Sequence, residues 1–112
     1  MTKKENCGFF AKVYEFVKNV PEGKVVSYGQ VALFLGNGRM SRRVGQALHV
    51  NPDPEHVPCH RVVFRDGSLT PGFAFGGPEV QRERLEREGV TFTPDGRVKP
   101  EHFAFGLPGK TR

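Results

Sequence analysis

Apolar side chains recur along the first part of the chain at the spacing of one helix face. They stand at i, i+4, i+7, i+8 and i+11, as Phe9, Val13, Phe16, Val17 and Val20. This spacing follows the 3.6-residue period of an α-helix, so the side chains share one stripe. The turn residues of 21–24, Pro-Glu-Gly-Lys, stop the pattern. The sequence therefore predicts an amphipathic helix that buries one face.

A capping pattern opens a second helix after a short β-prone stretch at 24–26. Ser27 occupies an N-cap position, and Gln30 follows three residues later, at the spacing of a capping box. The apolar positions of this helix are Val31, Ala32, Phe34 and Leu35. Glycine and asparagine at 36–38 end it.

A third helix is predicted at 41–50, where Ser41 can act as the cap. Its apolar side consists of Val44, Ala47 and Leu48. Two helices joined by a short glycine-containing turn form a helix-turn-helix candidate, whose second helix enters a DNA groove with its first residues leading. Here these residues are Ser41, Arg42 and Arg43, and such side chains suit phosphates and base edges. An ordinary helical hairpin with solvated arginines fits the turn spacing equally well.

Beyond residue 61 the apolar runs become short. Residues 62–69 predict a β-hairpin that turns at Asp-Gly, and residues 79–89 predict a charged helix with i,i+3 and i,i+4 ion pairs. Glycine, proline and phenylalanine fill 70–78, where the glycines would let the backbone approach a flat ligand. A surface loop pinned by two buried phenylalanines is the alternative. Glu88 stands in the last turn of the charged helix, where the helix dipole disfavours an anion. Either a cationic or imidazole partner holds it there, or it is simply solvated.

Composition and charge narrow the function classes. The chain has 112 residues, enough for one domain, and its 17 Lys+Arg exceed its 12 Asp+Glu to give a net charge of +5. This balance favours a polyanionic partner such as nucleic acid or an acidic membrane surface. No apolar run approaches the ~20 residues that span a bilayer, and no secretory signal is present. Cys7 and Cys59 are too few for a disulfide framework and lack metal-site spacing. We therefore expect a reducing cytosolic compartment and no metal or other cofactor.

A thiol, an imidazole and a guanidinium stand side by side at Cys59, His60 and Arg61. The prolines at 52, 54 and 58 push their preceding residues towards extended geometry, so residues 51–58 read as a stiffened loop that delivers Cys59 to a fixed place. A reactive cysteine needs electropositive, partly exposed surroundings, which His60 and Arg61 could supply. An unpaired cysteine can equally be a small core hydrophobe.

Residues 58–63, Pro-Cys-His-Arg-Val-Val, resemble the active-site signature of the O6-alkylguanine-DNA alkyltransferases, also called methylated-DNA–protein-cysteine methyltransferases. The resemblance runs from Phe10 to Gly89. Further features stand in the family's order: the start of its helix-turn-helix at 23–32, its recognition helix at 41–48, the opening of its loop at Asn51-Pro52 and its closing Glu-Gly at 86–89.

The resemblance implies a fold that is mainly α with a short β-hairpin, a winged-helix-like helix-turn-helix DNA-binding domain. We expect a single alkyltransferase-type domain over 1–112, ordered at 6–108, without the N-terminal domain of the larger transferases. It also implies a monomeric, cytoplasmic DNA repair protein, nucleoid-associated if the source is bacterial.

The implied activity is a one-use repair reaction on duplex DNA that contains O6-alkylguanine. Such proteins bind the minor groove and rotate the damaged base into a pocket, where the cysteine keeps the alkyl group irreversibly. The residues that match the family's catalytic positions are the nucleophile Cys59, the base His60 acting through a water, its support Glu88, and Asn51, which holds the turn in shape. The matching DNA-binding residues are Tyr28, which assists base rotation, Arg42, which fills the gap in the duplex, and Ser41, Arg43, Gln46 and Arg61. The expected lesion pocket consists of Pro54, Val62, Phe73, Phe75, Gly76 and Gly77.

The lid of this pocket, residues 72–77, departs from the transferase pattern. It lacks the Tyr and Ser that typical transferases place before Gly-Gly and has two additional residues, so a hydroxyl that would hydrogen-bond the guanine O6 is missing from it. The compact chain and its C-terminal segment are similar to alkyltransferase-like proteins, which bind O6-alkylguanine without removing it and hand the lesion to nucleotide excision repair proteins. Those proteins typically have Trp or Ala in place of Cys59. We favour transfer to Cys59, with lesion binding alone as the alternative; a regulator that reads undamaged DNA would have no use for the Cys59 loop.

Overall fold

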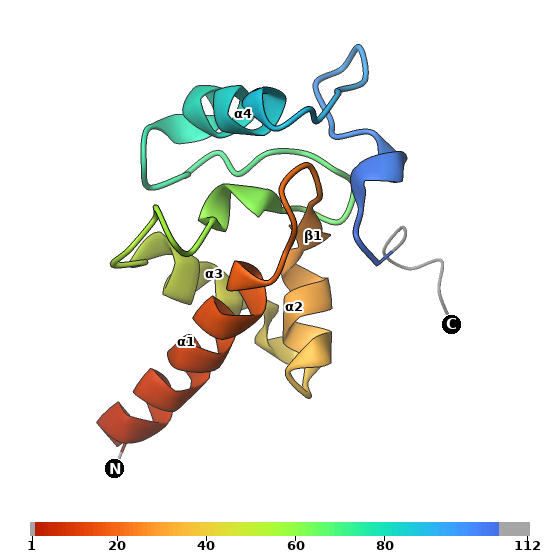
Figure 1. The fold of residues 1–112 in the computed structure, drawn as a ribbon. Helices are drawn as coiled ribbons and strands as arrows, with labels where there is room; N and C mark the ends of the chain where they lie inside the picture. Colours follow the sequence, from red (N-terminus) through yellow and green to blue (C-terminus); the bar gives the residue numbers. More distant parts are fainter. Residues whose placement is uncertain (1, 106–112) are drawn as a thin grey trace.

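A computed structural model describes residues 2–105, with side chains from residue 8 onward. The expected order of 106–108 and the side chain of Cys7 lie outside these residues. The four α-helices are α1 (Thr2–Lys18), α2 (Tyr28–Phe34), α3 (Ser41–His49) and α4 (Gly77–Arg87). The two short strands are β1 (Val26–Ser27) and β2 (Val62–Val63), and the 3₁₀ turns are η1 (Gly38–Met40), η2 (Cys59–Arg61) and η3 (Pro100–His102). The expected mainly α architecture is confirmed (Figure 1).

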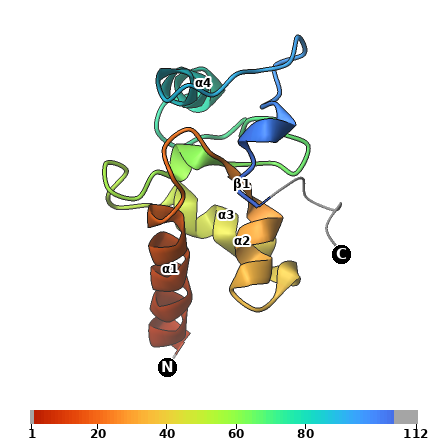
Figure 2. The ribbon, with the colours of Figure 1, turned by 45° about the vertical axis from the view of Figure 1, so that its right-hand side comes forward.

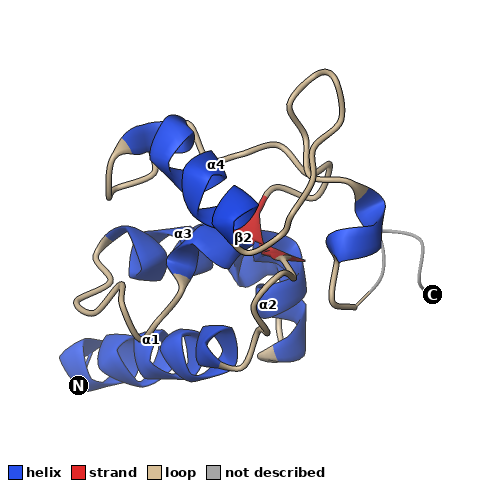
Figure 3. Ribbon diagram, turned by 45° about the horizontal axis from the view of Figure 1, so that its top comes forward, coloured by secondary structure: helices blue, strands red, loops and turns tan. Residues whose placement is uncertain are grey.

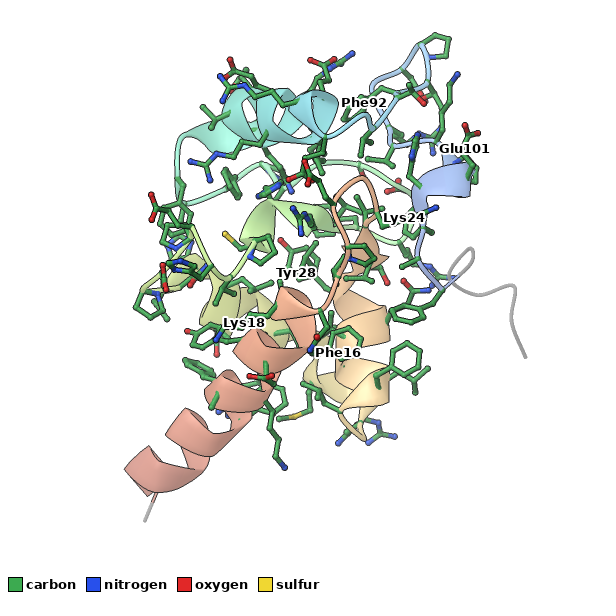
Figure 4. The ribbon with its side chains drawn as sticks, viewed as in Figure 1. Phe16, Lys18, Lys24, Tyr28, Phe92 and Glu101 are labelled. Atoms are coloured by element: carbon green, nitrogen blue, oxygen red, sulfur yellow. The ribbon has the colours of Figure 1, made fainter. Side chains whose placement is uncertain are left out.

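The predicted stripe of the first helix is its buried face. Val13 and Val17 are fully buried, and the hydroxyl of Tyr14 donates to the backbone oxygen of Ala47 at 2.8 Å, which ties α1 to α3. Phe16 lies nearer the surface, where its ring stacks on Phe34 of α2 at 5.5 Å (Figure 4). Among the described residues, no helix is both long and apolar enough to cross a membrane.

The helix-turn-helix forms as predicted, with one local correction. Ser27 and Gln30 make the capping box: the Gln30 N–H donates to Ser27 Oγ at 3.0 Å, and the Ser27 N–H donates to Gln30 Oε1 at 3.0 Å. Asn37 then accepts from the Arg39 N–H at 2.9 Å and starts η1, which runs straight into α3. Ser41 is therefore the first residue of α3 rather than its cap, because η1 already continues the backbone into the helix.

The expected hairpin does not form as a pair of strands. The chain does turn at 66–67, where Phe64 N–H donates to the Ser68 oxygen at 3.0 Å, but β2 pairs in parallel with β1 in the register Val26↔Val62. The far arm of the turn is held instead by the C-terminal segment, since Val98 N–H donates to the Gly67 oxygen at 2.9 Å. A strand buried on both faces is typical of parallel pairing, and both residues of β2 are fully buried.

Two hydrophobic clusters meet at this small sheet. The larger one lies among α1, α2 and α3 and includes Val26 and Val62. The smaller one lies under α4 and consists of Val25, Val63, Leu85, Val90, Val98 and Phe103. Figure 2 shows α4 as a layer above the three N-terminal helices, and in Figure 3, where the top of the molecule comes forward, α4 overlies α3 and β2. Consecutive residues of each strand point to opposite faces, so the sheet joins the two layers and fixes η2 at their boundary.

Candidate functional site

Cys59 is the first residue of η2, at the end of the proline-stiffened loop, and the residue is only 4% exposed. Buried Asn51 spans this loop: its side-chain amide donates to the Val57 oxygen at 2.9 Å, and its side-chain oxygen accepts from the Asp53 N–H at 3.0 Å. Cys59 N–H in turn donates to the Val57 oxygen at 2.7 Å. Asn51 therefore fixes the backbone that presents the sulfur.

An imidazole, a carboxylate and a guanidinium form a connected group that starts at the residue after Cys59. His60 Nε2 lies 2.8 Å from Glu88 Oε2, while Arg61 donates to both carboxylate oxygens, from Nε at 3.0 Å and from Nη2 at 2.8 Å. Arg61 Nη1 also donates to the Val20 oxygen at 2.7 Å, just beyond α1. The Glu88 side chain is 12% exposed, so it has partners rather than solvent in the last turn of α4.

These contacts set the protonation states of the pair. Burial lowers the pKa of His60, and the hydrogen bond and charge of Glu88 oppose that shift without cancelling it. Burial alone would raise the pKa of Glu88, but hydrogen bonds from Arg61 and His60 hold it below its ordinary value. At neutral pH the carboxylate is charged and the ring is neutral. Since Nε2 faces the carboxylate, the ring proton belongs there and the basic lone pair belongs to Nδ1. Nδ1 is buried and has no hydrogen-bond partner in the described part of the chain.

The thiol itself is not activated in the free protein. Burial raises the pKa of Cys59, although a hydrogen bond with Asn51 and the positive charge of Arg84 favour the thiolate. The sulfur is therefore protonated at neutral pH. A reaction at this sulfur needs a base, and the free lone pair of His60 Nδ1 is suited to that role.

A small cavity of about 40 Å³ adjoins the thiol. Its lining residues are Tyr28, Gly45, Leu48, His49, Cys59, Thr70, Gly72, Phe73 and Ala74. The volume slightly exceeds the share of one water molecule in the liquid, about 30 Å³, so a purine fits only after the walls move apart. The lid forms part of these walls.

Of the six residues expected in the lesion pocket, only Phe73 lines this cavity. Val62 is buried in the sheet, and Pro54 lines a different cavity that adjoins His60 and Glu88. Phe75 packs edge-on against Phe73, with 5.8 Å between ring centroids. Gly76 is the N-cap of α4 and has φ +124, and a Cβ there would come within 2.6 Å of Val80. Gly76 and Gly77 thus shape the join of lid and helix.

A larger groove of about 620 Å³ lies outside the cavity. It is lined by Tyr28, Gly29, Gly38, Ser41, Arg42, Gly45, Phe64, Arg65 and Thr70. Three of these residues, Tyr28, Gly45 and Thr70, also line the cavity, so the cavity lies behind the groove. Figure 4 shows Tyr28 near the centre of the molecule. Its hydroxyl lies 2.6 Å from Thr70 Oγ1, across the boundary between the two spaces.

Arg42, Arg43, Arg61 and Gln46 take four different positions. Arg42 is exposed in the groove, and Gln46 is exposed on α3 outside its lining. Arg43 instead places its guanidinium over Phe9 and Phe10 of α1, at 5.8 and 6.0 Å from the ring centroids. Arg61, expected to contact DNA, is largely buried against Glu88 and Val20, because its guanidinium finds carboxylate and carbonyl acceptors there.

Three functional candidates escaped the sequence reasoning: Thr70, Gln81 and Arg84. Gln81 is fully buried, and its amide nitrogen donates to the backbone oxygens of His60 and Val62 at 3.2 and 3.1 Å. The sequence does carry a signal for the burial of Gln81, because Gln81, Leu85 and Glu88 stand at i, i+4 and i+7 and so share one face of the helix. Nothing local marks Thr70 or Arg84. The described residues contain no group of three or more His, Cys, Asp or Glu that could hold a metal ion.

Comparisons with known proteins find similar proteins over most of the chain. Residues 8–90 match the family model described as 6-O-methylguanine DNA methyltransferase, DNA binding domain. The chain is 42% identical to alkyltransferase-like protein 1 of Schizosaccharomyces pombe over 73% of its length and 76% of that protein. It is 37% identical to the methylated-DNA–protein-cysteine methyltransferase of Rattus norvegicus over 87% of its length but only 44% of that protein. The crystal structure of S. pombe Atl1 with damaged DNA containing O6-carboxymethylguanine superposes with a TM-score of 0.71 at 39% identity, covering 86% of this chain and 94% of that one.

Proposed function

Because the chain belongs to the family of the 6-O-methylguanine DNA methyltransferase DNA-binding domain, we propose that it repairs duplex DNA by taking an alkyl group from O6-alkylguanine onto Cys59. The observation that carries this proposal is the buried, hydrogen-bonded group of His60, Glu88 and Arg61, which begins at the residue after Cys59. A merely structural cysteine has no need of a neighbouring residue whose neutral imidazole keeps a buried lone pair without a partner in the described residues.

The groove supplies the DNA-binding surface in this proposal. Arg42 lines it from the first turn of α3, and Arg65 adds a second cation to the lining. The helix lies in the minor groove, and Arg42 fills the gap left by a rotated base. The base then passes Tyr28 and Thr70 to reach Cys59, because these residues separate groove from cavity. Rotation of a base costs a few kcal/mol, which the inserted side chain partly offsets.

The proposed transfer conserves every proton and electron pair. The thiol proton of Cys59 passes through a water to Nδ1 of His60, whose Nε2–H is held by Glu88. The sulfur attacks the O6-alkyl carbon, a C–S bond forms, and the C–O6 bond breaks with its electron pair moving to O6. The proton on His60 then neutralises the departing guanine. Cys59 keeps the alkyl group as a thioether, so each protein molecule reacts once.

Intact-mass measurement tests transfer directly. The protein is incubated with a duplex that contains one O6-methylguanine and is then weighed. We expect the mass to rise by one CH₂ unit in the wild type and to stay unchanged in Cys59→Ser. An unchanged wild-type mass, with binding to the duplex shown in parallel, would reject transfer.

Lesion binding without chemistry is the second candidate. It is favoured by the raised pKa of the buried Cys59 thiol and by the lid, which carries no side-chain hydroxyl. In this version the bound protein marks the lesion for nucleotide excision repair proteins. It predicts that wild type and Cys59→Ser form complexes of equal affinity and lifetime, and that O6-methylguanine is recovered intact from the bound duplex. Loss of the methyl group from the DNA would exclude it.

A further inference from the structure

Thr70 stands where the groove meets the cavity, two residues ahead of the lid. Thr70 lines both the groove and the cavity, whereas Cys59 lines the cavity only. The Thr70 side chain is part-buried, and its Oγ1 lies 2.6 Å from the Tyr28 hydroxyl. A base that moves from the groove towards Cys59 therefore meets this pair of hydroxyls on the way.

The backbone of Thr70 is fixed relative to the nucleophile turn. Thr70 N–H donates to Gln81 Oε1 at 2.9 Å, while the amide nitrogen of the same Gln81 donates to the backbone oxygens of His60 and Val62. Gln81 is fully buried, so water does not compete for these hydrogen bonds. One side chain thus connects the segment that carries the thiol to the segment that carries the Thr70 hydroxyl.

The hydrogen bond with Tyr28 leaves the Thr70 proton available to a ligand. Burial raises the pKa of Tyr28, and the hydrogen bond with Thr70 only partly opposes this, so the phenol keeps its proton. A phenol is a stronger acid than an aliphatic alcohol, so Tyr28 donates and Thr70 Oγ1 accepts. The Thr70 O–H is then free to rotate towards an occupant of the cavity. The other side chains around Cys59 offer little competition: Gly72, Phe73 and Ala74 have no polar group, and His49 is exposed at the end of α3.

We propose that Thr70 is the lesion-reading residue of this pocket, whose hydroxyl donates a hydrogen bond to O6 of the rotated purine. This inference rests on the proposed function and deepens it, because it assigns the donor that the lid lacks to a residue outside the lid. The same bond serves binding and transfer. It recognises the ether oxygen of the intact lesion, and it strengthens when the C–O6 electron pair moves to O6.

A comparison of substitutions at Thr70 on different bases tests the assignment. Thr70→Val removes the hydroxyl at nearly constant shape, Thr70→Ser keeps it, and Thr91→Val is the matched control, since the Thr91 hydroxyl bonds His102 outside the pocket. All variants carry Cys59→Ala, which prevents alkyl transfer during titration without adding a second hydroxyl to the cavity, and the Cys59→Ala protein is the parent of the series. Affinities are measured by fluorescence anisotropy at one salt concentration, for duplexes with O6-methylguanine, 2-aminopurine or guanine at the same position. 2-Aminopurine keeps the ring and its amino group but has no oxygen at position 6.

We expect Thr70→Val to weaken binding of the O6-methylguanine duplex about five- to tenfold, the value of one hydrogen bond. Its affinity for the 2-aminopurine duplex should stay within about twofold of the parent, and Thr70→Ser and Thr91→Val should match the parent on all three duplexes. An equal loss on 2-aminopurine, or no loss on O6-methylguanine, overturns the role of Thr70.

A measurement on the parent protein keeps the test independent of how the Thr70 variants fold. Replacing O6 by sulfur in the duplex gives a poor acceptor, so the parent should bind S6-methylthioguanine several-fold more weakly than O6-methylguanine. Equal affinity would overturn the proposed hydrogen bond. If the parent and the wild type bind lesion and guanine duplexes equally, the proposed function itself fails, and the role of Thr70 fails with it.

Discussion

Replacing Glu88 by Gln probes the group on which the proposed chemistry depends. The substitution keeps the size of the side chain and removes its charge. The carboxylate now accepts from Arg61 at two atoms and from His60 at one, at 2.8–3.0 Å. A glutamine offers one accepting oxygen, and its NH₂ group would face an N–H donor of one of these two partners. Arg61 would be left without a counter-charge in the described residues around it.

The expected loss of stability follows from the burial of the partners. Removing one member of a buried ion pair costs about 3–5 kcal/mol, whereas exposed pairs contribute about 0.2–1 kcal/mol. Glu88 and Arg61 are 12% and 15% exposed at their side chains, and the cavity of about 440 Å³ beside them is open to solvent. We therefore expect a loss of about 2–3 kcal/mol at pH 7.5. With a urea dependence of about 1.5 kcal/mol per molar, the unfolding midpoint falls by about 1.3–2 M.

Glu86→Gln is the matched control on the same helix. Glu86 pairs with Arg82 at 3.0 Å, but both side chains are about half exposed. The control should lose at most about 0.5 kcal/mol. Urea unfolding followed by circular dichroism measures both variants, and a double-mutant cycle with Arg61→Gln isolates the coupling. If Glu88→Gln loses no more than Glu86→Gln, or if the cycle shows no coupling, Glu88 does not hold the site together in the way described.

Three further predictions follow from the same structure. Arg42→Ala should weaken binding of lesion duplexes about tenfold or more with little change in stability, while the control Arg87→Ala, at an exposed side chain of α4, should leave binding unchanged. Equal affinities of Arg42→Ala and the wild type in a salt-controlled titration would show that Arg42 is not part of the DNA-binding surface. Because burial raises the pKa of Cys59, the alkylation of its thiol by iodoacetamide should be slow at neutral pH and accelerate only above pH ~8.5, and Arg84→Met should move this dependence of rate on pH to higher pH. A rate that rises at a lower pH would show an activated thiol. Because burial lowers the pKa of His60, the folded state holds the neutral ring, and the free energy of unfolding measured in urea should fall as the pH drops below about 6.5. A free energy of unfolding that stays constant between pH 7.5 and 5.5 would contradict the burial of a neutral His60 ring.

The connected group also shows why sequence reasoning stopped short at Arg61. The resemblance placed Arg61 among the DNA-binding residues. In the structure its guanidinium is largely buried, because the Val20 carbonyl beyond α1 and the Glu88 carboxylate at the end of α4 supply acceptors inside the protein. These acceptors lie 41 and 27 residues away in the chain. No pattern of neighbouring residues encodes that distance.

The sequence by itself determined what forms within a few residues. The stripe of α1, the capping box of Ser27 and Gln30, and the proline-stiffened loop before Cys59 all depend on contacts between near neighbours, so their spacing was enough to predict them. The family motif likewise pointed to Cys59 and His60 as the nucleophile and base that we propose.

Only the tertiary structure decided which distant segments meet. The partnership of β2 with β1 instead of a hairpin, the approach of Glu88 to His60, and the position of Thr70 at the cavity each require α4 to pack across the sheet. Strand pairing and buried hydrogen bonds between remote segments become favourable only when the hydrophobic clusters on both sides exclude water. That condition belongs to the folded chain as a whole, and for this reason the lesion-reading hydroxyl could not be identified from its neighbours in the sequence.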